Sequence, residues 1–299
     1  MTDSRLEAVS DSLLKKMQCT LRDEIELTGT GIFTGAQTSV RLYPALPNTG
    51  IVFQREDLPD SPLIPANFEF VQESFRCTTL ACNGASVMLV EHLLSALYAF
   101  GVDNVKIGVR GPEVPGLDGS ARCFIEALDR VGLVYQDVER KEIALDRPVF
   151  WSRGEIHLVA LPSPEFRLSY TMHYPQSSFL KSQYYSFSLD VDRYRSEIAP
   201  CRTFSLYEEI LPLVEKGLIR GGGLDSAVVI RGAEVLNPEG VRFPDEMVRH
   251  KVLDLIGDLS LVGFRFRAHV IAICSGHEAN VSFAEKISET LQSRSLCGS

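Results

Sequence analysis

The two halves of the chain show a similar succession of strand-like and helix-like segments, and this order limits the fold. A chain of 299 residues is long enough for two domains that each bury a core. Strands followed by amphipathic helices indicate an α+β domain, in which helices cover one face of a sheet. The sequence therefore predicts two α+β domains of similar construction.

In the first half, alternating apolar and polar residues predict strands over residues 20–29 and 38–43, beside the turn-forming segments TGTGIFTG and PALPNTG. Helical spacing predicts a helix over residues 90–100, which the following glycine ends. A strand over residues 104–109 and a helix over residues 120–131 complete this half.

The charged segment DVERKEIALDRP marks a crossing between the halves near residues 137–148. Beyond it, the same reasoning predicts strands over residues 157–160, 166–172 and 267–274, and helices over 206–216, 245–261 and 278–293. We therefore expect an N-terminal extension over residues 1–19, a first domain over 20–141 and a second domain over 142–299.

A short echo supports duplication of one unit. The tripeptides VEH at 90–92 and VRH at 248–250 both lie near a predicted helix start, and a leucine follows each histidine by five residues, at Leu97 and Leu255. A match at three positions also arises by chance, so duplication and coincidence both stay open.

Charge and cysteine usage narrow the class of protein. Thirty Lys and Arg against 39 Asp and Glu give a net charge of −9, so the overall field repels nucleic acid, and an anionic substrate needs a local basic patch. The seven cysteines form no CxxC pair, which indicates reduced thiols in a reducing compartment. We expect a protein that binds no nucleic acid.

No apolar run is long enough to span a bilayer, and the N-terminal MTDSRLEAVSD is charged where a signal peptide is apolar. A cytoplasmic protein without stable membrane insertion is expected. Leu6, Val9, Leu13 and Leu14 lie at helical spacing, which suits either a helix that touches a membrane or partner, or an ordinary terminal helix.

Two helical segments carry candidate metal ligands. His250 and Asp254 lie four residues apart in RHKVLDLIGD, so they share one helix face and could bind one metal ion; the ordinary alternative is a His–Asp hydrogen bond on a solvated face. His92 in VEHLL offers a third ligand, and a catalytic zinc uses three protein ligands and one open position. Glu91 points about 100° away from His92, where it could act as general base. Read alone, VEHLL is also an exposed Glu beside a half-buried His.

Two further residues suit supporting roles. Asp258 lies two turns beyond His250, too far along the helix to bind the same ion. His277 in SGH follows a predicted strand; an Asp that keeps a His protonated makes a general acid or an oxyanion stabiliser. A surface histidine without a catalytic role is the alternative.

At these residues the chain resembles the LpxC family of UDP-3-O-acyl-N-acetylglucosamine deacetylases. The resemblance runs from about residue 20 to 288 and rests on ten blocks in the same order: TGTGIFTG, NTGIVFQREDL, RCTTL, VEHLLSAL, GVDNV, GPEVPGLDGSA, CRTF, GGGLDSAVV, VLNPEGVRFPDEMVRHKVLDLIGDL and SGH.

The resemblance implies one zinc ion per chain and hydrolysis of the N-acetyl group of a UDP-linked 3-O-acyl-N-acetylglucosamine, the committed step of lipid A synthesis. It implies that the helices of both domains pack between the two sheets, with the active site at the seam. A monomer is expected. The residue roles that it implies are zinc binding by His92, His250 and Asp254, catalysis by Glu91, His277, Asp258 and Thr203, and substrate binding by Phe204, Lys251, Cys201 and Gly222.

The resemblance also places GGGLDSAVV at an apolar passage for the acyl chain. Two departures stand beside it: Phe33 replaces a histidine that the family usually has, and Leu89 replaces a threonine. Two other functions stay open on sequence alone, an inactive sugar-nucleotide binding protein and a metal-dependent hydrolase or dehydratase of another acyl substrate.

Overall fold

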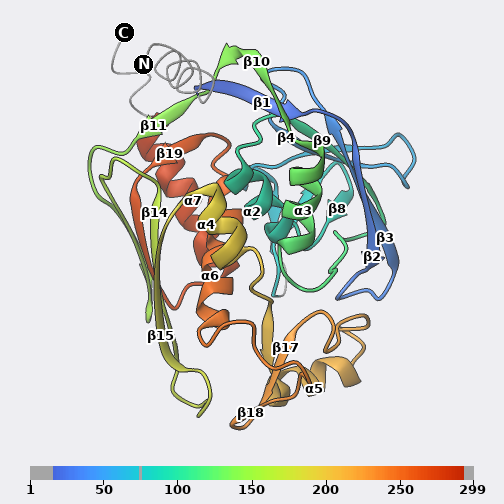
Figure 1. Cartoon of the computed structure of the whole chain (residues 1–299), viewed down its shortest axis with the longest axis vertical. Coiled ribbons are helices and arrows are strands. Elements are labelled where there is room, and N and C mark those ends of the chain that lie inside the picture. The colour runs from blue at the N-terminus through green and yellow to red at the C-terminus, as the bar shows by residue number, and fades with distance from the viewer. Residues whose placement is uncertain (1–15, 74–75, 293–299) are drawn as a thin grey trace, which may run out of the picture.

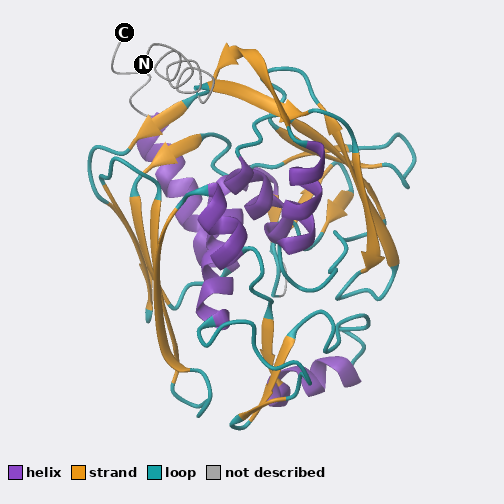
Figure 2. Cartoon of the chain, viewed as in Figure 1, coloured by secondary structure: helices purple, strands orange, loops and turns teal. Residues whose placement is uncertain are grey.

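The computed structural model describes residues 16–73 and 76–292. Two five-stranded sheets face one another, and the long helices lie between them (Figures 1 and 2). The first sheet has the order β2-β3-β9-β4-β5 and the second β12-β13-β20-β14-β15. This arrangement confirms the α+β fold expected from the sequence, with helices enclosed by two sheets.

The strands of the two large sheets are short, and most of them alternate in burial. In β3, for example, Thr38, Val40 and Leu42 point inward while their neighbours are partly or fully exposed, which is the pattern of a sheet covered on one face. The strands are β2 Ile25–Thr30, β3 Gln37–Pro44, β4 Ile51–Arg55, β5 Leu63–Pro65 and β9 Val105–Arg110 in the first sheet, and β12 Val149–Arg153, β13 Ile156–Leu161, β14 Arg167–Tyr174, β15 Lys181–Ser188 and β20 His269–Ile273 in the second.

Both sheets have the same topology. In each sheet, the first two strands in chain order form an antiparallel hairpin, and the last strand in chain order is antiparallel to the second strand and parallel to the third. The fourth strand closes the edge in antiparallel fashion. Equal strand order and direction in both halves favour duplication over the chance match that the sequence left open.

The four long helices occupy equivalent places in the two halves: α2 Glu91–Phe100 and α3 Arg122–Val131 flank β9, and α6 Glu246–Ser260 and α7 His277–Gln292 flank β20. Gly101 ends α2 with a φ of 93°, where its N–H reaches the carbonyl of Leu97. VEH and VRH, the tripeptides that resemble each other, therefore lie near the starts of corresponding helices, α2 and α6.

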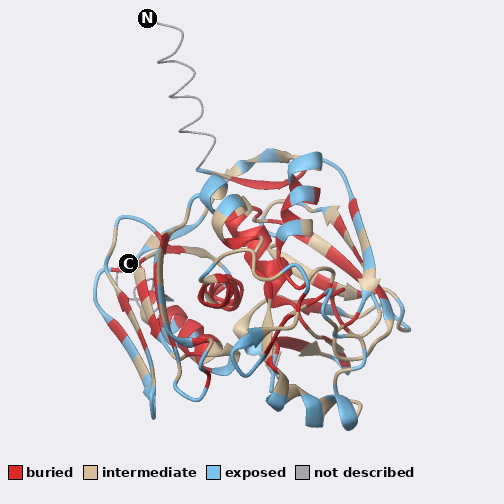
Figure 3. Cartoon of the chain, turned by 60° about the horizontal axis from the view of Figure 1, so that its bottom comes forward, coloured by how far each residue is buried: buried red, intermediate tan, exposed pale blue. Residues whose placement is uncertain are grey.

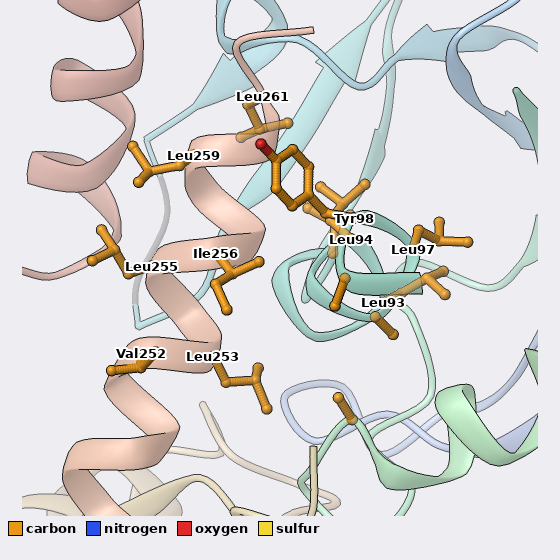
Figure 4. Close-up of a cluster of buried hydrophobic side chains, with 14 of the residues drawn as sticks. Leu93, Leu94, Leu97, Tyr98, Val252, Leu253, Leu255, Ile256, Leu259 and Leu261 are labelled. Atoms are coloured by element: carbon orange, nitrogen blue, oxygen red, sulfur yellow. The ribbon is translucent and has the colours of Figure 1, made fainter. Parts of the chain in front are cut away.

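The core includes the contact between α2 and α6, where Leu253 and Ile256 of α6 point toward α2 (Figure 4). Gly257 lies where the backbones come closest, since a Cβ there would be 2.2 Å from the main-chain oxygen of Glu91. Figure 3 shows the buried residues concentrated in these inner elements. The close approach brings the start of α2 beside the middle of α6.

Smaller elements surround this core. Two-stranded pairs join β1 Met17–Leu21 to β10 Leu133–Glu139 and β11 Glu142–Ala144 to β19 Arg265–Arg267. The remaining elements are β6 Val71–Gln72, β7 Thr79–Cys82, β8 Ala85–Val87, β16 Phe204–Leu206, β17 Val228–Arg231, β18 Glu234–Val235, η1 Phe68–Phe70, α4 Val191–Arg193, the π-helical turn η2 Tyr194–Ile198 and α5 Tyr207–Glu215. Strands β17 and β18 and helix α5 project from the body of the protein (Figure 1).

Two expected strands are wrong as single elements. Residues 20–29 divide into the end of β1 and most of β2, separated by a turn in which the Asp23 carboxylate accepts the N–H of Glu24. Residues 267–274 divide at Ala268 between β19 and β20, which belong to different sheets. Periodicity alone does not reveal a change of sheet, because both pieces keep the same alternation.

The expected helix over residues 1–16 lies, apart from its last residue, outside the described residues. Strand β1 begins at Met17, so Met17 and Cys19 of the expected extension pair with β10 in the first half. The boundary near residue 141 stays a prediction and falls between β10 and β11. Among the described residues, no helix has the length and apolar character needed to cross a membrane.

Candidate metal centre

A cavity of about 770 Å³ opens at the seam between the halves, where the starts of α2 and α7, the middle of α6 and strand β16 meet. His92 lines it from α2, and His250 and Asp254 line it from α6. All three side chains are buried. The structure thus brings together three residues that are up to 162 positions apart in the chain (254 − 92).

One ligand atom from each of the three lies within 4.8 Å of the others. The Nε2 atoms of His92 and His250 are 3.6 and 3.2 Å from Asp254 Oδ1, and the two rings are nearly perpendicular, with centroids 5.0 Å apart. His250 Nδ1 lies 3.0 Å from the carbonyl oxygen of Cys201, which is the type of second contact that orients a metal-binding histidine.

Asp254 Oδ1 is buried and has no hydrogen-bond partner among the described residues. A buried carboxylate oxygen without a partner is costly unless a cation satisfies it. The other oxygen, Oδ2, accepts a hydrogen bond of 2.8 Å from Lys251 Nζ. Oδ1 and two histidine nitrogens therefore converge on one point, as a metal ion requires.

Charge inside the site favours an ionised aspartate. Burial alone raises the pKa of Asp254, but the neighbouring His250 and Lys251 outweigh burial and hold that pKa well below its usual range. Burial also acts on Lys251, whose pKa it lowers, and the Asp254 charge reverses this effect so that the pKa is raised overall. Asp254 is thus a carboxylate, the form that binds a metal.

Glu91 lies beside the ligand set without joining it. Its Oε2 accepts the main-chain N–H of Thr78 at 3.0 Å, and its Oε1 is 3.7 Å from His277 Nε2. Burial raises the pKa of Glu91 to about 7, with His277 opposing and Asp258 and Asp254 assisting the rise. A carboxyl group with this pKa can accept and return a proton near neutral pH.

His277 and Asp258 form a pair. His277 Nδ1 is 2.9 Å from Asp258 Oδ2, and Asp258 is fully buried at the end of α6 away from the ligands. Burial by itself lowers the pKa of His277, but the charges of Asp258 and Glu91 outweigh burial and raise the pKa to about 9. His277 is therefore protonated at neutral pH and can donate from Nε2 toward the cavity.

Thr78 and Asn280 complete this pair, and sequence reasoning missed both. Thr78 Oγ1 donates to Asp258 Oδ1 at 2.6 Å, and Asn280 Nδ2 donates to Asp258 Oδ2 at 2.8 Å. Thr78 belongs to the RCTTL block, so the signal was present, but no spacing rule connects a threonine to an aspartate 180 residues away. The N–H and hydroxyl of Thr78 together link Glu91 to Asp258.

The cavity wall carries three of the four residues expected to bind substrate. Phe204, Lys251 and Gly222 line it, together with Thr203, and Lys251 Nζ lies 5.7 Å from the centre of the Phe204 ring. Cys201 is fully buried and is not part of the cavity lining. We therefore do not propose Cys201 as a substrate contact; its carbonyl orients His250 instead.

The departures from the family pattern at Phe33 and Leu89 both lie at this cavity. Phe33 and Leu89 contribute to its lining, and Leu89 has a φ of 60°, an uncommon conformation for a leucine, two residues before Glu91. The side chain of Leu89 supplies no hydrogen bond, and Thr78 provides the polar contacts to Glu91 and Asp258.

Fold and site together define a class of protein. Two similar α+β halves enclose a buried His₂Asp set, with a glutamate and a protonated histidine at its side, and this is the residue set of a mononuclear metal-dependent hydrolase. The family model of LpxC, described as UDP-3-O-acyl N-acetylglycosamine deacetylase, matches residues 18–289. The chain belongs to the LpxC family.

Curated relatives agree with this assignment. The UDP-3-O-acyl-N-acetylglucosamine deacetylase of Chlamydia pneumoniae is 46% identical over 94% of this chain and 100% of its own length. The proteins of the same name from Chlamydia trachomatis serovar L2 and Chlamydia felis are each 44% identical over 94% of this chain, and over 98% and 100% of their own lengths. The resemblance seen in the sequence is therefore confirmed.

Proposed function

We propose that this chain is a zinc-dependent deacetylase that hydrolyses the N-acetyl group of UDP-3-O-acyl-N-acetylglucosamine, the committed step of lipid A synthesis. The products are the free 2-amine and acetate. Membership of the LpxC family supports the reaction and the substrate. The observation that carries the proposal is Asp254 Oδ1, which is buried, unpartnered and directed at the Nε2 atoms of two histidines.

The donor set fits zinc. Two imidazole nitrogens and one carboxylate oxygen, with the fourth side facing a cavity, are the ligands of catalytic zinc sites. His92, His250 and Asp254 would hold one ion per chain. When bound, zinc would polarise the acetamide carbonyl and acidify water.

The protein's own groups move the protons. Glu91 takes a proton from the attacking water, and its pKa of about 7 leaves part of it ionised at neutral pH; a cation beside it would lower that pKa further. The protonated His277 and the hydroxyl of Thr203 stabilise the negative oxygen that forms on the carbonyl. Glu91, once protonated, and His277 are the two groups that can protonate the leaving amine.

The cavity suits the rest of the substrate. Lys251 and Phe204 provide a cation and an aromatic face for the sugar and its diphosphate, in a protein whose net charge is −9. Apolar side chains from the α5 region, including Ile210, Val214 and Ile219, line another part of the cavity and suit an acyl chain. We further propose a cytoplasmic monomer in which any contact with membranes is peripheral.

The decisive experiment measures acetate release and bound metal on the same protein. Zinc-loaded protein should release acetate from the 3-O-acylated UDP-sugar, stripped protein should not, and added zinc should restore the rate. Full activity of metal-free protein would overturn the zinc assignment. Binding of the UDP-sugar without acetate release would identify a binding protein, and zinc-dependent hydrolysis of other acyl substrates alone would identify a different hydrolase.

A further inference from the structure

One wall of the cavity is built from both halves of the chain. The loop of residues 31–35, between β2 and β3, lies against the glycine-rich segment 220–222 that follows α5. The N–H of Arg220 reaches the carbonyl of Phe33 at 3.1 Å, and those of Gly221 and Gly222 reach the carbonyl of Ile32 at 3.1 and 3.0 Å. Ile32 and Phe33 line the cavity on one side of this junction, and Gly222 lines it on the other.

The segment 207–224 is otherwise held by an ion pair between Arg76 and Glu209, a hydrogen bond from Asn237 Nδ2 to the Leu224 carbonyl, and the packing of α5 on β16 and β17. Helix α5 contains no buried residue, and four apolar side chains of the segment, Leu211, Val214, Leu218 and Leu224, are between 39% and 51% exposed. In Figure 1 the helix lies apart from the two large sheets. On the side of the cavity formed by the first half, the three backbone hydrogen bonds to loop 31–35 therefore help to fix the position of this wall.

Loop 31–35 is itself held by Glu113, which is fully buried and is not part of the cavity lining. Its Oε2 accepts the N–H of Phe33 at 3.1 Å, and its Oε1 accepts both the N–H of Thr34 at 2.8 Å and the hydroxyl of Thr34. Gly31 makes room for this carboxylate, because a Cβ there would lie 2.0 Å from Glu113 Oε1.

The main chain at Glu113 is rigid. Its carbonyl accepts the hydroxyl of Thr38 in β3, and the flanking residues Pro112 and Val114 exchange backbone hydrogen bonds with Met88. The carboxylate therefore has a fixed position. It holds loop 31–35, and this loop in turn holds the glycine-rich segment 220–222 of the other half.

We propose that Glu113 is a positioning residue that holds the acyl-chain wall closed and thereby gives the enzyme its preference for long acyl chains. This inference rests on the proposed function. Each buried methylene changes kcat/KM by about fourfold. If the wall opens, kcat/KM should therefore fall strongly for substrates with a long acyl chain and only slightly for those with a short one. The chemical groups at the metal centre are not touched by Glu113.

Glu113→Gln should disrupt the hydrogen bonds between this side chain and loop 31–35. Both carboxylate oxygens accept N–H groups, so an amide in either orientation points its NH₂ at a donor. With substrates that differ only in acyl length, the variant should lose about tenfold in kcat/KM on the longest chain, the equivalent of one to two buried methylenes. On the shortest chain it should change by less than about twofold.

Two further variants make the test selective. Thr34→Val removes one hydroxyl donor to Glu113 and leaves the carboxylate in place. Like Glu113→Gln, it should therefore weaken the dependence of kcat/KM on acyl-chain length. Glu56→Gln is the matched control, because Glu56 accepts from Tyr43 within the first half and is not part of the cavity lining; it should leave that dependence unchanged.

Equal losses at all chain lengths in Glu113→Gln would show a general structural role and overturn the proposal. If Glu113→Gln does not fold, an unchanged chain-length dependence in Thr34→Val overturns it instead. A native protein that releases no acetate from any of these substrates refutes the proposed function itself, which is a different result from native activity without an effect of Glu113.

Discussion

Glu91, His277 and Asp258 form a line of titratable side chains beside the proposed metal ligands, with neighbouring charged atoms 3.7 and 2.9 Å apart. Because these groups are shielded from water, each one sets the proton affinity of the next. Single substitutions in this line should therefore change the chemistry more than the fold.

Glu91→Gln should keep the metal ion and lose at least about two orders of magnitude in kcat, because the amide cannot take a proton from water. The amide oxygen can still accept the N–H of Thr78. Zinc content and acetate release on the same preparation check this, with Glu126→Gln on the exposed face of α3 as control. Loss of zinc in Glu91→Gln would instead make Glu91 a ligand.

Asp258→Asn should move the alkaline limb of kcat/KM to lower pH. Asp258 is the largest of the effects that raise the pKa of His277, to about 9, and a neutral amide no longer favours the imidazolium. The limb is read from pH profiles of native and variant enzyme. Because the pair acts as a unit, the double variant should cost little more than loss of His277 alone; additive losses with an unmoved limb would contradict the pairing.

The same raised pKa has a consequence for stability. A histidine whose pKa is higher in the folded than in the unfolded protein stabilises the fold fully below the unfolded pKa of about 6.5. This contribution is lost as the pH rises toward the folded value of about 9. Denaturant unfolding over this range should show a smaller decline in Asp258→Asn than in the native protein.

Among the secondary-structure elements, α6 contributes the most residues to the candidate site. His250, Asp254 and Asp258 follow one another at four-residue steps, so the first two share one ion and the third reaches His277 one turn farther on. Helix α2 brings Glu91 and His92 to this face. The separation of the two helices therefore determines whether the three ligands can meet.

Gly257→Ala should weaken metal binding and destabilise the protein. Helix propensity alone favours alanine by about 1 kcal/mol, but the new Cβ would lie 2.2 Å from the main-chain oxygen of Glu91, so α2 has to move away from α6. Competition with a chelator measures zinc affinity, and denaturant unfolding measures stability. A more stable variant with native zinc affinity would contradict this prediction, because it would show that α2 and α6 can accommodate the Cβ without loss of stability or metal binding.

At the scale of the whole molecule, the proposed metal site joins two similar halves. His92 belongs to the first half, and His250 and Asp254 belong to the second. An ion bound by both halves favours the folded protein over the unfolded chain by mass action, by about 2.7 kcal/mol at a free metal concentration of 100 Kd. Metal should thus affect stability as well as catalysis.

Removal of zinc by a chelator should lower Tm, and addition of zinc should restore it. Calorimetry with and without chelator measures the shift. Asp254→Ala should lose most of this zinc-dependent shift, whereas Asp245→Ala, which removes only an ion pair with Arg249 at the start of α6, should retain it. Identical Tm values for stripped and loaded native protein would rule out a site that joins the halves.

Local patterns in the sequence predict the long helices of this protein and several residues of its candidate site. Helical periodicity predicts α2, α3, α6 and α7, because a buried helix face repeats its apolar residues every three to four positions. The four-residue step from His250 to Asp254 already places both on one face. The ordered blocks of the LpxC family then identify the remaining candidates, and the family is confirmed.

Only the tertiary structure decided which distant residues meet. Residues 20–29 and 267–274 each divide between two sheets, and the hydroxyl of Thr78 reaches Asp258 across 180 positions of the chain. The isolated Oδ1 of Asp254 also exists only in the folded protein. A residue's local pattern records which side of an element is buried, whereas its partner depends on how whole helices and sheets pack, and many packings satisfy the same pattern.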